Sequence, residues 1–248
     1  MASNEKIKKE IRNKIWRLME EKNIARFPRP VYGRIPNFIG AEEAARRLTT
    51  IPEWRKAEIL FINPDSPQKP VRALALIEGK KVVMASPRIK RGFILLNPKE
   101  IPRGREWDAA TIKGAFRYGR IIHPSEIHVD AKITGSVAVD PQGGRVGKGH
   151  GYSDIEYGIL REYGAIDASA PIITTVHDIQ VVEYIPMTEH DMPIDIIVTP
   201  SRIIRTHTKY KKPDGVFWEL VDRKMLEEIP LLAELYGQKF KLSIDRSK

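Results

Sequence analysis

The sequence predicts an α/β protein of three layers, in which helices flank a mainly parallel sheet. Six short apolar runs rich in Ile and Val are bounded by Pro, Gly or Asp, as buried strands are. They are EILFIN (58–63), KVVMAS (81–86), GFILLN (92–97), KITGSVAVD (132–140), PIITTVH (171–177) and PIDIIVT (193–199). Helix-like stretches lie between several of them. This alternation indicates βαβ units, whose parallel strands place ligand sites at their carboxyl ends.

The helices are predicted from apolar residues at helical spacing. Ile7, Ile11, Ile15 and Leu18 define an amphipathic helix over 5–23. The other helical stretches are 41–48, 70–78, 108–118, 154–163 and a longer one near 217–237. A proline-rich connection fills 26–40, RTHTKYKKPDG is a hairpin, linker or loop, and 241–248 is expected to fray. We interpret 1–248 as one α/β domain with an N-terminal helix (5–23) and a C-terminal helical extension (about 215–240).

Composition narrows the class of function. The chain has 42 Lys plus Arg against 32 Asp plus Glu, a formal charge of +10, which favours nucleotides, phosphorylated metabolites, nucleic acid or anionic lipid as partners. It has no cysteine, so disulfides, thiolate metal sites and a cysteine nucleophile are excluded. The sequence contains no apolar run of membrane-spanning length and no secretory leader, so we expect a cytoplasmic protein without a membrane partner.

The most informative motif is GGRVGKGHGYSD, residues 143–154. It follows a predicted strand and precedes a predicted helix, whose start carries Ser153 and Glu156 at capping-box spacing and Asp154 in the first turn. Free amides at a helix start, with glycines that permit close approach, form an anion site. Arg145 and Lys148 would add charge-assisted donors. The alternative interpretation is a mobile surface turn with solvated basic residues.

The motif matches neither of the common phosphate loops. The Walker pattern needs four residues between its first glycine and the Gly-Lys pair, followed by Ser or Thr; here three residues separate Gly143 from Gly147-Lys148, and Gly149 follows. The dinucleotide pattern G-x-G-x-x-G also differs, because Gly147, Gly149 and Gly151 form G-x-G-x-G.

GGRVGKGHGYSD does resemble the glycine-rich motif of 5-formyltetrahydrofolate cyclo-ligases, G-x-R-L-G-x-G-x-G-Y-Y-D. KKEIRNKIW, VVMASPRI and EHDMPIDIIVTPSRII agree in order, so the resemblance covers most of residues 6–205. FPRPVYGRIPNF, GSVAVDPQGGRVGKGHGY and TTVHDIQVV are most similar to the divergent branch of methenyltetrahydrofolate synthetase domain-containing proteins. The resemblance implies a NagB/RpiA/CoA-transferase-like fold. It also implies an enzyme that uses MgATP to phosphorylate the formyl oxygen of 5-formyltetrahydrofolate, after which N10 attacks and phosphate leaves.

The resemblance assigns roles to individual residues, with ATP and Mg²⁺ as cofactors. Arg145 and Lys148 are the expected catalytic cations. Asp154 and Asp195 are the expected Mg²⁺ ligands. The residues expected to bind the triphosphate are Lys8, Arg12, Arg145, Gly147, Lys148, Gly149, Gly151 and Tyr152. Lys8 and Arg12 are one helical turn apart and so share a face, although such charges are also typical of a solvated helix surface.

The chain departs from the cyclo-ligase pattern on the substrate side. Tyr152-Ser153 replaces two adjacent tyrosines, and FINPDSPQKPVRAL has Asp65 where the family has a substrate-binding glutamate. Two classes of function therefore stay open. The first is an ATP-dependent enzyme, either a 5-formyltetrahydrofolate cyclo-ligase or a relative with another folate-like or small-molecule substrate. The second is a non-catalytic nucleotide- or nucleic-acid-binding protein, which the +10 charge favours.

Overall fold

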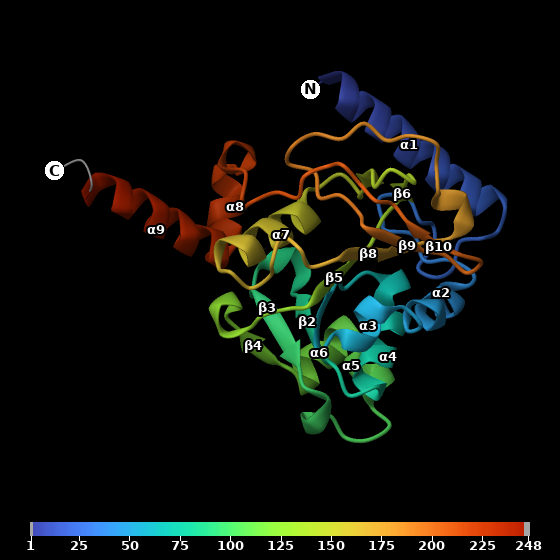
Figure 1. The fold of residues 1–248 in the computed structure, drawn as a ribbon, viewed down its shortest axis with the longest axis horizontal. Coiled ribbons are helices and arrows are strands. Elements are labelled where there is room, and N and C mark those ends of the chain that lie inside the picture. The colour runs from blue at the N-terminus through green and yellow to red at the C-terminus, as the bar shows by residue number, and fades with distance from the viewer. Residues whose placement is uncertain (1, 246–248) are drawn as a thin grey trace.

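A computed structural model describes residues 2–245, and its centre is an eight-stranded sheet (Figure 1). The strand order is β10-β9-β8-β5-β1-β2-β3-β4. The strands of this sheet are β1 (Ile59–Ile62), β2 (Lys81–Ala85), β3 (Phe93–Leu96), β4 (Arg120–Ile122), β5 (Ala131–Thr134), β8 (Ile172–Thr175), β9 (Ile196–Val198) and β10 (Ile203–Arg205). A separate antiparallel ribbon joins β6 (Ala138–Val139) to β7 (Arg145–Val146).

The five central neighbours, β9, β8, β5, β1 and β2, pair in parallel, whereas β10, β3 and β4 pair antiparallel at the two sides. The mainly parallel sheet predicted from the sequence is therefore confirmed, and each of the six predicted runs contains a strand. β4, β7 and β10 were not predicted. Each is only two or three residues long, too short to show an alternating pattern.

Helices cover both faces of the sheet, which confirms the three layers. The helices are α1 (Ala2–Glu21), α2 (Ala41–Leu48), α3 (Pro52–Lys56), α4 (Lys69–Ile77), α5 (Glu106–Ala109), α6 (Ile112–Tyr118), α7 (Tyr152–Glu162), α8 (Arg223–Glu228) and α9 (Pro230–Asp245). One core packs α2–α6 against Leu60, Val82 and Ile94. The opposite core packs α7 and the C-terminal helices against Phe61, Val83 and Phe93. α1 lies over the β6-β7 ribbon on a third cluster.

The predicted strand KITGSVAVD is divided in two at Gly135. β5 ends at Thr134, and the chain then leaves the sheet to form the ribbon that carries the glycine motif. A Cβ atom at Gly135 would lie 2.7 Å from Ile35 and 3.0 Å from Asp65 and Gln68, so only glycine fits. This close approach brings the glycine motif over the carboxyl ends of β1 and β5.

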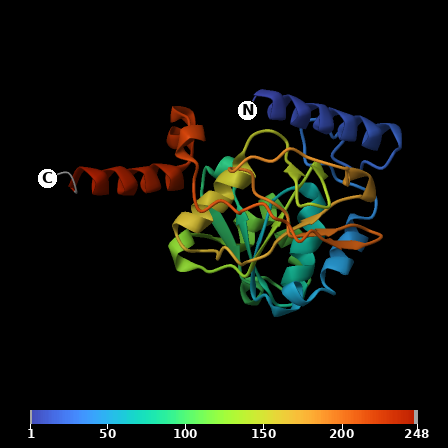
Figure 2. The same cartoon turned by 45° about the horizontal axis from the view of Figure 1, so that its top comes forward.

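The C-terminal stretch forms two helices instead of the single predicted one. Ile229 has an extended backbone because Pro230 disfavours the helical conformation in the residue before it. α9 projects from the body of the molecule (Figures 1 and 2) and continues to Asp245, so the expected fraying of 241–245 is not observed; 246–248 lie outside the described residues. RTHTKYKKPDG begins with the last residue of β10 and continues as a loop. Among the described helices, none has the length and apolarity needed to cross a membrane.

Candidate functional site

The glycine motif has two parts, a tight turn and an open loop. In the turn, Asp140 Oδ1 accepts hydrogen bonds from the backbone N–H groups of Gln142 and Gly144, at 2.8 and 2.9 Å, and Gly143 has a φ of 97°. The second part, 147–151, runs to α7, with Asp154 in the first turn as predicted. The predicted capping box is wrong. Gly151 is the N-cap, without a side-chain cap, and Ser153 and Glu156 make contacts elsewhere.

A cavity of about 780 Å³ lies against this loop. Its walls come from α1, the proline-rich connection, the turns after β1 and β2, the loop and start of α7, the segment at 190–191, and residues 213–228. The turns after β1 and β2 lie at carboxyl ends of parallel strands, where sites in α/β proteins are expected. The cavity is large enough for a nucleotide or a similar small molecule.

Lys8 and Arg12 of α1 lie beside the glycine loop rather than on a solvated helix face. The Lys8 ammonium is buried and pairs with Asp191 at 2.6 Å. Arg12 Nε donates to the carbonyl of Gly147 at 2.8 Å, and its guanidinium lies under Gly149. Both residues line the cavity, so α1 contributes positive charge to its rim.

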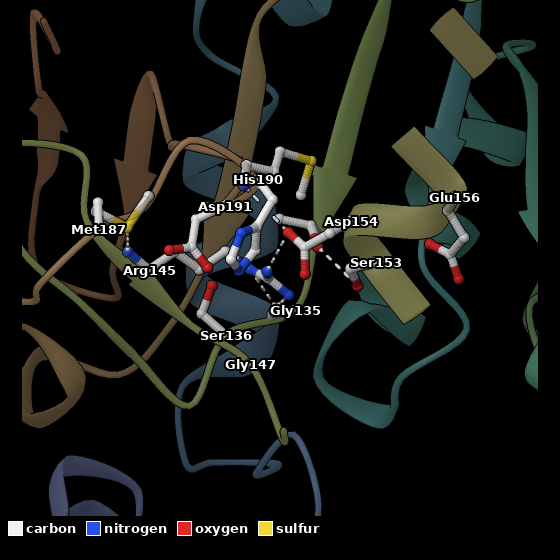
Figure 3. A network of polar contacts seen from close by, with 12 residues as sticks. Gly135, Ser136, Arg145, Gly147, Ser153, Asp154, Glu156, Met187, His190 and Asp191 are labelled. Carbon is white, nitrogen blue, oxygen red and sulfur yellow. Dashed lines mark hydrogen bonds and ion pairs between the residues drawn. The ribbon is translucent and has the colours of Figure 1, made fainter. Parts of the chain in front are cut away.

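Arg145 and Lys148 also line the cavity but differ in environment. The Arg145 guanidinium is buried and donates twice to the carbonyl of Gly135, at 3.0 and 3.2 Å, with a further nitrogen 3.6 Å from Asp154 Oδ1 (Figure 3). The Lys148 ammonium is more exposed and lies 3.2 Å from Asp65 Oδ1. Arg145 is thus a fixed positive charge and Lys148 a movable one. Gly147, Gly149, Gly151 and Tyr152 complete this wall.

The structure does not bring the two predicted metal-binding carboxylates together. Asp154 faces the cavity, and its Oδ1 accepts from the Met192 N–H at 3.1 Å, which leaves Oδ2 available. Asp195 is not among the cavity-lining residues. It precedes β9, at the opposite end of a parallel strand from the site. There its Oδ2 is 2.7 Å both from the Ile172 N–H and from the Lys212 ammonium.

Asp191 lies in the cavity instead, and the sequence reasoning missed it. Asp191 is four residues before Asp195 in the same EHDMPID segment. The segment therefore indicated an acidic residue at the site, but its sequence did not show which of the two aspartates lies in the cavity. Burial raises the pKa of Asp191, but hydrogen bonds from Lys8 and Thr188 outweigh it and hold this pKa below its usual range. The carboxylate therefore stays charged and ties α1 to the segment at 188–191.

A buried polar cluster of Asn63, Lys132 and Glu156 was also missed. Lys132 is fully buried in β5, with its ammonium 3.1 Å from Glu156 Oε2 and 3.1 Å from Asn63 Oδ1. Asn63 Nδ2 donates to the same Glu156 oxygen at 2.7 Å. Burial lowers the pKa of Lys132, and the Glu156 carboxylate opposes that shift. A lysine at the start of the apolar run KITGSVAVD was the available signal, because lysine is rarely buried unpaired.

Residues 213–228 close the cavity with an apolar wall that includes Val216, Phe217, Leu220 and Met225. The Phe217 ring packs edge-on against His190 with centroids 5.9 Å apart. The chain reaches this position by crossing α7 at Gly158, where a Cβ atom would lie 2.9 Å from the Gly215 carbonyl oxygen. The C-terminal segment is therefore part of the site.

Together, these features define a class: an α/β protein with a glycine-rich, positively charged loop over the carboxyl edge of its sheet. Residues 4–200 match the 5-formyltetrahydrofolate cyclo-ligase family. The chain belongs to that family, which is a family of enzymes, and the resemblance noted in the sequence is confirmed.

The chain is similar to named relatives of two kinds. It is 39% identical over 239 residues to a methenyltetrahydrofolate synthase domain-containing protein of Bos taurus, a match that covers 93% of this chain and 62% of that protein. It is 25% identical to a probable 5-formyltetrahydrofolate cyclo-ligase of Schizosaccharomyces pombe, over 64% of this chain and 83% of the relative. The NMR structure of Aquifex aeolicus 5,10-methenyltetrahydrofolate synthetase has the same fold, with a TM-score of 0.52, 20% identity, and coverage of 83% of this chain and 95% of that one. The chain thus spans less than two thirds of the Bos taurus relative.

Proposed function

We propose that this chain binds MgATP and uses it in a cyclo-ligase reaction, with 5-formyltetrahydrofolate or a related formylated or amide-like compound as the acceptor. The observation that carries the proposal is the convergence of Lys8, Arg12, Arg145 and Lys148 with the glycine loop on one cavity. These residues come from segments more than 130 residues apart, and the fold brings them to one place. A triphosphate is an anion that such a group of donors would hold.

The residues have distinct tasks in this proposal. The loop amides and Arg12 would hold the phosphate chain, and the fixed Arg145 would orient it beside Asp154. Lys148 would exchange its Asp65 partner for a phosphate oxygen and neutralise charge that develops during transfer of the γ-phosphoryl group to the formyl oxygen. The acceptor's own nitrogen then attacks the activated carbon and phosphate leaves, so no protein nucleophile is required.

Magnesium fits Asp154, because its hydrogen bond and ion pair to the described residues are both made by Oδ1, which leaves Oδ2 for an ion. The described residues contain no cluster of three His, Asp or Glu side chains able to hold a metal ion. The ion would therefore take most of its ligands from phosphate oxygens and water, as Mg²⁺ commonly does. When bound, it would supply charge neutralisation on the phosphates.

Calorimetric titration with MgATP tests the nucleotide part of the proposal. We expect binding by the unmodified protein, weakened about 10-fold or more in Lys148→Ala through loss of one charge-assisted hydrogen bond. Lys81→Ala is the control, because Lys81 is an exposed lysine at the amino end of β2, the opposite end of that strand from the cavity, and does not line it. Absence of nucleotide binding by the unmodified protein would reject the proposal.

An absorbance assay for methenyl formation from 5-formyltetrahydrofolate, with and without ATP, tests the acceptor. ATP-dependent product identifies the cyclo-ligase reaction. ATP binding without product would direct attention to another formylated or amide-like acceptor.

A further inference from the structure

The buried cluster of Asn63, Lys132 and Glu156 has one carboxylate oxygen that accepts no hydrogen bond from the part of the chain that the structure describes. Asn63 Nδ2 and the Lys132 ammonium both contact Glu156 Oε2. Asn63 Oδ1 accepts from Lys132 at 3.1 Å, so the amide is engaged at both ends. That oxygen is Glu156 Oε1, which has no hydrogen bond to any described residue although the Glu156 side chain is only 5% exposed.

That carboxylate borders the cavity. Asn63 and Glu156 both line it, whereas Lys132 lies behind them. Figure 3 shows Asp154 directed toward Arg145, with Glu156 on the far side of Ser153 along the same helix. Glu156 is therefore removed from the Arg145 and Asp154 side of the site, where the phosphates are placed in the proposed function.

Buried contacts to Arg72 and Phe61 hold the cluster in place. The Arg72 guanidinium is buried and donates to the backbone carbonyls of Asn63, Pro64 and Asp65, which fixes the turn after β1. Lys132 also lies over the Phe61 ring, 4.1 Å from its centroid. A carboxylate fixed in this way presents its free oxygen in a defined direction, which is the requirement for selective recognition.

We propose that Glu156 is the acceptor-recognising carboxylate of the site, and that it accepts a hydrogen bond from a neutral N–H group of the acceptor, as in an amide or an aminopyrimidine ring. The donor is neutral because the Glu156 carboxylate is already paired with the Lys132 ammonium, so the two side chains together carry no net charge. A cationic donor at Glu156 would meet the Lys132 ammonium behind it, with no free negative charge on the pair to balance the added cation. This inference rests on the proposed function for the identity of the site.

Two ligands test the proposal directly. 5-Formyltetrahydrofolate carries a 2-amino group on its pyrimidine ring, and its analogue with methyl in that position lacks this N–H donor. We expect the unmodified protein, with Mg²⁺ and a non-hydrolysable ATP analogue present so that the ligand is not consumed, to bind the amino compound about 10- to 100-fold more tightly, as expected when a buried acceptor is left unpaired.

The test variant is Lys132→Met/Glu156→Leu, which removes both charges and so avoids leaving one buried alone. We expect it to bind MgATP as the unmodified protein does and to bind the two ligands equally. If Glu156 serves only to neutralise Lys132, the variant will keep the preference for the amino compound, and the proposal is overturned.

Two results with the unmodified protein would overturn the proposal even if the variant does not fold. These are equal affinity for the two ligands, or no binding of either while MgATP binds. Failure of the proposed function is distinguishable, because there MgATP itself would not bind.

Discussion

Lys132 affects both the stability of the fold and the geometry of the candidate site, because it is buried and pairs with Glu156, which lines the cavity. Its ammonium is fully buried and has Glu156 as its ionic partner. Removing either charge alone would leave the other in the low-dielectric interior, where an unpaired ion is costly. The pair is therefore expected to behave as a unit in mutagenesis.

We predict that Lys132→Met alone destabilises the protein by about 3–5 kcal/mol, because it leaves the Glu156 carboxylate buried without a counter-ion. The double variant Lys132→Met/Glu156→Leu should recover most of that loss. Urea unfolding of the three proteins measures it. Equal destabilisation in the single and double variants would show that the pair is not the source of the effect.

The ion pair between Asp191 and Lys8, which attaches α1 to the segment at 188–191, is expected to make the stability of the protein depend on pH. The folded pKa of Asp191 is held low, so its contribution to the free energy of unfolding is present above its unfolded pKa of about 4 and is lost as pH falls through the folded value. We expect stability to decline below about pH 4, and less steeply in Asp191→Asn, which lacks the titrating group. Urea unfolding between pH 7 and pH 3 measures this slope. Identical slopes in the two proteins would contradict the assignment.

At the scale of elements, the crossing of α7 by the C-terminal segment depends on Gly158. We predict that Gly158→Ala costs about 1–3 kcal/mol, because its methyl group would push against Gly215 and Val216. Gly237→Ala is the matched control, since Gly237 is also helical and has nothing within 4 Å of an added Cβ. It should be neutral or stabilising, as alanine is the better helix former. Comparable losses in both variants, measured by thermal unfolding, would argue against steric crowding.

Elements with strong periodic patterns were predictable from the sequence, and those set by tertiary contacts were not. Five of the six apolar runs contain the parallel central strands β1, β2, β5, β8 and β9, and the helix predicted over 154–163 corresponds to α7. The break at Gly135 was not predicted, because it depends on the close approach of Ile35 and Gln68, which are distant from Gly135 in the sequence. Ser153 and Glu156 had capping-box spacing, but the buried Asn63 and Lys132 offered stronger partners.

The same distinction applies to the candidate site. The glycine loop, Arg145 and Lys148 were found as a contiguous motif, and the cavity lies where they are. Asn63 and Lys132 were missed because neither belongs to a recognisable motif in its own segment. Only the folded structure shows that both contact Glu156. Asp195 was selected over Asp191 because sequence spacing does not reveal which end of a strand faces the cavity.

At the scale of the whole molecule, the cavity is lined both by α1 and by residues 213–228, which are far apart in the sequence. α1 provides Lys8 and Arg12, and residues 213–228 provide the apolar wall. Ligand bound there would contact both terminal regions and the sheet between them. It would therefore oppose global unfolding rather than stabilise one segment.

We predict that MgATP at 100 times its dissociation constant raises the free energy of unfolding by about 2.7 kcal/mol. Lys148→Ala should show a smaller increase at the same nucleotide concentration, since its affinity is reduced. Chemical unfolding with and without MgATP provides the measurement. An increase that Lys148→Ala leaves unchanged would place nucleotide binding elsewhere on the molecule.

The ends of the sheet have a consequence for behaviour in concentrated solution. β4 and β10 terminate it, each is three residues long, and each carries an exposed arginine, Arg120 or Arg205. An unpaired strand edge is a template on which another chain can add a strand, and short, charged edges hinder that addition. The antiparallel margins thus protect the open sheet against edge-to-edge aggregation between copies of the protein.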